Sequence, residues 1–183
     1  MRLAWMTAAL AFALPSLASA RPITAGASLG RIQSKANAEG EASDTFQLFG
    51  RIGFTQRLGA QLELQKIEDP DLDVRSGTAL LVVELANNPH WAPILVAGMG
   101  IDHASNDWYE ASGTHIEGGL GLEYRADGGL TIGADVRLGG RSVTEQTEVY
   151  PALEGDVVYF APYSYGLVEG EYRSARLYAA IRF

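Results

Sequence analysis

In the last thirteen residues of the chain, Glu171 to Phe183, every second position counted back from the end is apolar as far as Ala175. Successive side chains on a strand point to opposite faces, so this spacing predicts a β-strand with one apolar face. Chain ends of soluble proteins usually fray. A strand that continues to the end is typical of membrane barrels, in which the last strand closes the sheet against the first.

The first twenty residues have the organisation of an export signal. Arg2 precedes the apolar run Ala8 to Leu14, and the small residues Ala18 to Ala20 form a cleavage site. The run is shorter than the ~20 residues that a membrane helix needs. We therefore expect residues 1–20 to be a signal peptide and residues 21–183 to form one barrel domain.

Composition excludes several classes of protein. The sequence has no cysteine, which rules out disulfides and thiolate metal sites. Its net charge of −8 argues against nucleic acid as a partner. Beyond the signal peptide there is no run of 18 apolar residues, so only a closed barrel, whose backbone groups all pair, could embed this chain in a membrane.

Eight segments of alternating polarity follow one another along the mature chain. They are residues 23–30, 46–55, 61–65, 78–85, 94–102, 115–124, 130–139 and 171–183. Short links follow the second, fourth and sixth segments, whereas longer ones, 33–43, 67–77, 103–114 and 142–170, follow the others. This pattern predicts an all-β, eight-stranded antiparallel up-and-down transmembrane barrel in the outer membrane of a Gram-negative cell envelope, with short periplasmic turns and longer extracellular loops. The alternative, a soluble lipocalin-type barrel, would turn its apolar face inward.

The face that carries glycine and charge is the better candidate for the lumen. An eight-stranded barrel is just wide enough for side chains to fill it, and buried charges of opposite sign are expected to pair. The predicted lumenal ion pairs are drawn from Arg51, Glu63, Glu84, Glu117, Glu123, Asp135, Arg137, Arg176 and Arg182. A salt-bridged plug is the main interpretation, and a narrow, porin-like pore is the alternative.

Three stretches resemble a known family. Phe49 to Phe54, Ala92 to Gly100 and Gly118 to Tyr124, together with the terminal Phe183, look like the small outer-membrane proteins of the OmpA-type transmembrane-domain family. The resemblance implies outer-membrane lipid, lipopolysaccharide and the barrel assembly machinery as partners. It also implies an insertion signal made of Leu177, Ala179, Ile181 and Phe183. It implies no chemistry, because members of this size are often adhesins or structural proteins.

One group of residues has the composition of a hydrolase site. His103 and Ser105 share a face, so the histidine could activate the serine, and Glu117 could orient the histidine. The run His103 to Asn106 resembles the His-x-Ser-Asn motif of outer-membrane lipid A 3-O-deacylases. That family carries the motif at the end of the penultimate strand, where this chain has no histidine. The alternation also places Glu117 on the opposite face, so a lipid A hydrolase is the second interpretation.

The predicted outer loops are acidic and aromatic. Asp69, Asp71 and Asp73 have a spacing found in calcium loops, but Pro70 and Val74 do not fit one, and we expect no metal and no cofactor. The loop aromatics are Trp108, Tyr109, Tyr150, Tyr159, Phe160, Tyr163 and Tyr165. They suit an interfacial girdle or the binding of an extracellular protein. The sequence thus favours a non-enzymatic barrel with a structural or adhesin-like role.

Overall fold

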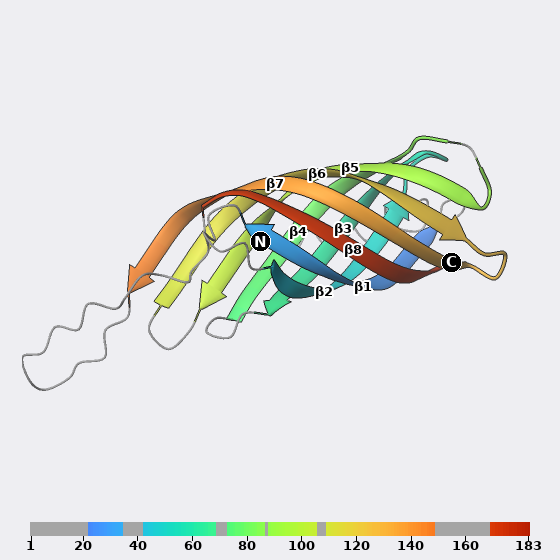
Figure 1. Cartoon of the computed structure of the whole chain (residues 1–183). Coiled ribbons are helices and arrows are strands. Elements are labelled where there is room, and N and C mark those ends of the chain that lie inside the picture. The colour runs from blue at the N-terminus through green and yellow to red at the C-terminus, as the bar shows by residue number, and fades with distance from the viewer. Residues whose placement is uncertain (1–21, 35–41, 69–72, 87, 106–108, 149–168) are drawn as a thin grey trace, which may run out of the picture.

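The computed structural model describes residues 22–34, 42–68, 73–86, 88–105, 109–148 and 169–183. These form eight antiparallel strands that close into one barrel (Figure 1). The strands are β1 (Ile23–Ser34), β2 (Ala42–Gly53), β3 (Leu58–Glu68), β4 (Asp73–Glu84), β5 (Trp91–Ser105), β6 (Tyr109–Arg125), β7 (Leu130–Glu148) and β8 (Gly170–Arg182). The predicted fold class is confirmed. Within the described residues, no helix is both long and apolar enough to cross a membrane.

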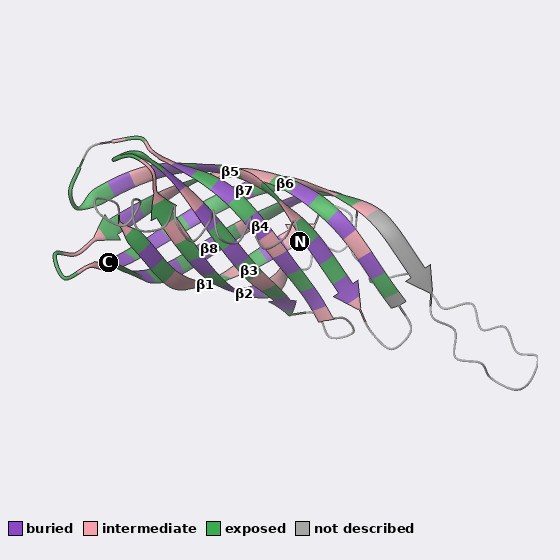
Figure 2. Ribbon diagram, turned by 180° about the vertical axis from the view of Figure 1, so that it is seen from behind, coloured by how far each residue is buried: buried purple, intermediate pink, exposed green. Residues whose placement is uncertain are grey.

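Buried and exposed side chains alternate along every strand (Figure 2). The apolar side chains face outward: Leu64 is 70% exposed, Leu138 is 72% and Leu177 is 69%. The charged side chains of Glu63 and Arg137 face inward and are almost fully buried. This polarity is the reverse of that in a soluble barrel, so the lipocalin-type alternative is excluded.

The barrel closes where β8 meets β1. The register pairs Ala27 with Ala179, and the backbone N–H of Phe183 donates to the carbonyl oxygen of Ile23 at 2.8 Å. Leu177 and Ile181 face outward on this seam. The C-terminal strand therefore has the closing position that its alternation predicted.

The strands continue beyond the segments that were predicted as outer loops. β5 and β6 remain paired as far as Ser105 and Glu110, and β3 pairs with β4 as far as Glu68 and Asp73. Most of the predicted loops 67–77 and 103–114 is therefore strand. β7 reaches past the other strands at the end of the barrel away from the C-terminus (Figure 1). Apolar alternation therefore ends earlier along the chain than strand pairing does.

Side chains in the short turns satisfy backbone groups. The Asn88 side chain accepts hydrogen bonds from the backbone N–H groups of His90 and Trp91, both at 2.9 Å. The Thr55 hydroxyl accepts one from Leu58 at 2.9 Å. Gly129 has a φ of 84°, a left-handed conformation that glycine adopts without strain. These turns link β4 to β5, β2 to β3 and β6 to β7.

Candidate functional site: the ion-paired lumen and the outer rim

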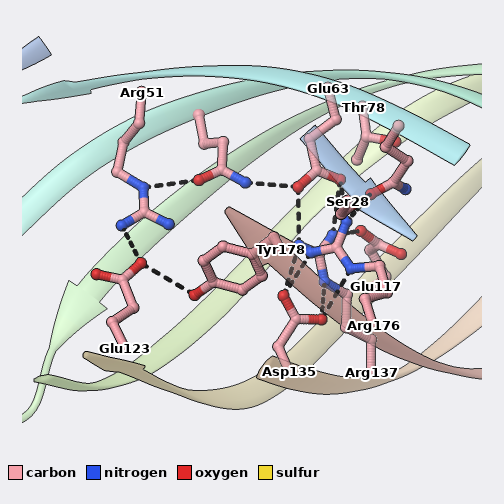
Figure 3. A network of polar contacts seen from close by, with 12 residues as sticks. Ser28, Arg51, Glu63, Thr78, Glu117, Glu123, Asp135, Arg137, Arg176 and Tyr178 are labelled. Atoms are coloured by element: carbon pink, nitrogen blue, oxygen red, sulfur yellow. Dashed lines mark hydrogen bonds and ion pairs between the residues drawn. The ribbon is translucent and has the colours of Figure 1, made fainter. Parts of the chain in front are cut away.

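The centre of the lumen holds two arginines clamped by shared carboxylates (Figure 3). Arg137 on β7 donates to Glu63 on β3 at 2.8 and 2.9 Å, and it also contacts Asp135 and Glu117. Arg176 on β8 donates to Asp135 at 2.5 and 2.9 Å and to Glu63 at 3.0 Å. All five side chains belong to what we call the central cluster, which also includes Gln47.

A second set, the short-turn cluster, lies between the central cluster and the short turns. Arg51 on β2 donates to Glu123 on β6 at 2.5 Å. Arg125 binds Glu84 through two hydrogen bonds, at 2.6 and 2.9 Å, and also donates to Glu123 at 2.9 Å. Tyr178 donates to Glu123 at 3.0 Å. The side chain of Gln61 bridges Arg51 and Glu63, so the short-turn and central clusters form one network (Figure 3).

The third set, the outer cluster, lies toward the outer ends of the strands. Asp102 on β5 accepts from His115 Nδ1 at 2.9 Å and from Arg141 Nε at 2.7 Å. His115 Nε2 lies 3.0 Å from the hydroxyl oxygen of Thr78. Tyr172 packs edge-on against His115, lies beneath the guanidinium of Arg141 and donates to Glu117. The hydroxyl, imidazole and carboxylate are arranged as in a nucleophilic triad. All three are buried, however, and Arg141 shares the carboxylate, which makes this a structural contact.

Eight of the nine residues predicted to pair in the lumen make ion pairs there. The pairs join Arg51 to Glu123, Glu84 to Arg125, Glu63 and Glu117 to Arg137, and Asp135 to Arg137 and Arg176. Arg182 departs from the set. It lies at the last position of β8, its side chain is exposed, and none of the described carboxylates pairs with it. The strand ends there, so its inward face is already open to water.

The structure does not bring the three hydrolase candidates together. His103 and Ser105 lie on β5, and the His103 imidazole faces outward, 3.8 Å from Glu110. Glu117 lies on the opposite side of the wall, where it pairs with Arg137 and accepts a hydrogen bond from Tyr172 at 3.1 Å. Glu117, the carboxylate predicted to orient His103, therefore belongs to the lumenal network, and the described carboxylate nearest to His103 on the outer face is Glu110.

Most of the predicted loop sites lie outside the described residues. These are Trp108, Tyr150, Tyr159, Phe160, Tyr163, Tyr165, Asp69 and Asp71, and of Tyr109 only the backbone is described, at the start of β6. Asp73 is described, and it accepts hydrogen bonds from Arg75 at 2.5 and 3.2 Å. No group of three metal-ligating side chains occurs among the residues whose positions are given.

Comparison with known proteins finds similar structures and no similar sequence. No protein-family model and no curated protein sequence matches this chain. Neisserial surface protein A has a TM-score of 0.58 at 11% identity, covering 89% of this chain and 97% of that one. The N-terminal β-barrel domain of Pseudomonas aeruginosa OprF has a TM-score of 0.54 at 16% identity, covering 87% and 97%. Ail, the attachment invasion locus protein of Yersinia pestis, has a TM-score of 0.50 at 15% identity, covering 89% and 97%. At these identities the likeness is one of fold, and this chain has the closed eight-stranded architecture of small outer-membrane barrel proteins.

Proposed function

We propose that this protein is a non-enzymatic β-barrel of the outer membrane, exported through residues 1–20, with a plugged lumen and a role in surface interaction. Its exterior supports the membrane location. Large apolar side chains such as Leu62, Met99 and Ile116 are exposed around the wall. Near the short turns, Trp91 packs against Tyr124 with ring centroids 5.0 Å apart, and both are exposed, as expected of an interfacial aromatic girdle.

The observation that carries the proposal is the continuous ion-paired filling of the lumen. The three clusters use five arginines and six carboxylates of the described strands. Their charges nearly balance, so they leave no strong field that would select one sign of ion. The side chains of Arg137 and Arg176 are 1% and 3% exposed, which leaves no open path beside them. These features favour a salt-bridged plug over a narrow pore.

With the lumen filled and the wall facing lipid, the outer strand ends remain as the surface for recognition. Charged side chains replace apolar ones there, as Glu68, Asp73 and Glu110 illustrate. Loops carried on a rigid scaffold are favourable places for binding. The aromatic residues predicted in the connection between β7 and β8 add to this surface. These features support an adhesin-like or structural role, and Glu117, the carboxylate predicted for the hydrolase alternative, lies in the lumen.

Planar-bilayer conductance tests the plug. We expect wild type to give current close to that of the empty bilayer. Glu63→Ala combined with Arg137→Ala deletes one cation and one anion, so it opens space while keeping the charge balance, and we expect it to raise the conductance. Heat-modifiable gel mobility would verify that both proteins are folded. A wild-type conductance well above that of the empty bilayer would refute the plugged barrel.

A further inference from the structure

Three basic side chains lie side by side on the outer surface of β3, β4 and β5. The sheet register pairs Lys66 with Arg75 and Arg75 with His103. All three side chains are exposed. Neighbouring strands are about 4.8 Å apart, so the three residues cover about 10 Å of the barrel wall. We call them the basic row.

An apolar recess lies directly below the basic row, two residues nearer to the middle of each strand. Leu64, Gly77 and Ile101 are register partners there, and the recess continues over Met99 and Ile116. Gly77 forms its floor because it has no side chain. A Cβ at this position would make only ordinary contacts, 3.9 Å from Ile101 and 4.0 Å from Leu64. A larger side chain at position 77 would therefore fill the recess without displacing the backbone.

Carboxylates lie two residues beyond the basic row, toward the outer ends of the strands. Glu68 pairs in register with Asp73, and Ser105 with Glu110. Asp73 lies above the apolar surface, and the hydrogen bond from Arg75 lowers the pKa of Asp73, with smaller contributions from the charges of Lys66 and His103. These carboxylates repel an anion that approaches from the water side. Arg75 is ion-paired with Asp73 at 2.5 Å, and an anion whose apolar part lies in the recess would approach the basic row from the side away from these carboxylates.

We propose that the basic row and the recess form a binding site for the phosphorylated lipid portion of lipopolysaccharide. Acyl chains lie against Leu64, Gly77 and Ile101, and a phosphate contacts Lys66 and Arg75. The carboxylates of Glu68, Asp73 and Glu110, which lie beyond the basic row, disfavour a soluble anion. The recess is lined by residues from six strands, β3 to β8, which suits a lipid with several acyl chains better than one with two. The site rests on the proposed membrane location, since it binds a lipid of the outer leaflet.

Native mass spectrometry of the delipidated, refolded barrel in micelles tests the site. The probes are bisphosphorylated lipid A, the same lipid without its phosphates, and phosphatidylglycerol. We expect wild type to bind bisphosphorylated lipid A most tightly. Lys66→Gln with Arg75→Gln should weaken that binding by about tenfold, since each basic side chain near an anionic lipid contributes roughly a few-fold. Arg57→Gln with Arg182→Gln removes the same charge from exposed positions at the short-turn end and should leave binding unchanged.

Filling the recess provides a second test that leaves every charge in place. Gly77→Val should weaken lipid A binding by about fivefold, the factor that corresponds to losing roughly 40 Å² of apolar contact. Equal losses in the Lys66/Arg75 and Arg57/Arg182 variants would overturn the proposal, as would equal binding of phosphatidylglycerol. So would unchanged binding by Gly77→Val. Cell fractionation tests the proposed outer-membrane location separately from the lipid A site. A chain absent from the outer membrane would contradict the proposed function, whereas the measurement in micelles reports on the site alone.

Discussion

At the scale of single residues, glycines on one strand make room for large side chains from the next. Gly139 on β7 is the register partner of Tyr172 on β8, and a Cβ on Gly139 would overlap the Tyr172 ring. Gly133 has the same relation to Tyr178. These tyrosines in turn reach Glu117 and Glu123. The lumenal glycines are therefore part of the packing of the ion-paired network.

Two adjacent glycines of β7 give a matched test of this packing. Gly139→Val places a branched side chain against the Tyr172 ring, and we expect it to lower the free energy of unfolding by about 1–3 kcal/mol. Gly140→Val faces outward into open space and should change it by less than about 0.5 kcal/mol. Urea titrations in micelles, followed by gel mobility, would compare the two. Similar losses at both positions would contradict the role assigned to Gly139.

Alternation predicted which residues face the lumen, but not every pair that forms there. The ion pairs between Glu63 and Arg137 and between Arg51 and Glu123 cross the barrel between strands that are distant in sequence. Arg125 lies one residue beyond the predicted segment 115–124, although its odd position places it on the same face as Glu123. This odd-numbered position was the signal in the sequence that could have identified Arg125 as a lumenal residue. The partner of each charge depends on barrel stagger, which side-chain alternation does not encode.

At the scale of elements, the polarity pattern predicted the lipid-facing part of each strand and missed the remainder. β7 was expected over residues 130–139 and extends to Glu148. β6 continues in register with it past a bulge between Ser112 and Gly113. Beyond the apolar belt both faces of a strand meet water, so alternation loses its cause while the backbone pairing persists. Strand ends in such barrels are consequently invisible to a hydrophobicity pattern.

Replacing residues 149–168 with a short Gly-Ser turn tests the element that we assign to recognition. The register from Leu130 with Ile181 to Arg141 with Gly170 does not involve the replaced segment. We therefore expect an unchanged heat-modifiable shift. Attachment of expressing cells to an epithelial monolayer should fall to the level of cells without the protein. Undiminished attachment by a correctly folded variant would remove this connection from the recognition surface.

At the scale of the whole molecule, a closed sheet leaves no unpaired strand edge. Each strand pairs with two neighbours, and β1 with β8 completes the circle. In lipid, an open edge would leave backbone N–H and C=O groups without partners. Strand number was predictable from the eight alternating segments, antiparallel order from the alternation of short and long links, and closure from the need to pair every backbone group in a membrane.

The closing seam can be tested by cross-linking, since the sequence has no native cysteine. Ala27→Cys with Ala179→Cys places two outward-facing thiols on register partners of β1 and β8. Directly opposed residues of antiparallel strands have Cα atoms about 4.5–5.5 Å apart, within the range of a disulfide. We expect oxidation to give a faster-migrating species on a denaturing gel. Ala27→Cys with Ala134→Cys joins strands that are not neighbours and should give none; cross-linking in both pairs would contradict the register.

The central cluster has a consequence for how the barrel is assembled. Its members come from β2, β3, β6, β7 and β8, and Glu63 on β3 has its arginine partners on β7 and β8. In the proposed membrane setting, a partly inserted sheet without β7 and β8 would carry Glu63 into the lipid without its counter-ions, at a cost of several kcal/mol. Arg176 arrives last, with the strand that closes the seam. We therefore expect insertion to be cooperative, with neutralisation of Glu63 and closure of the sheet in the same step.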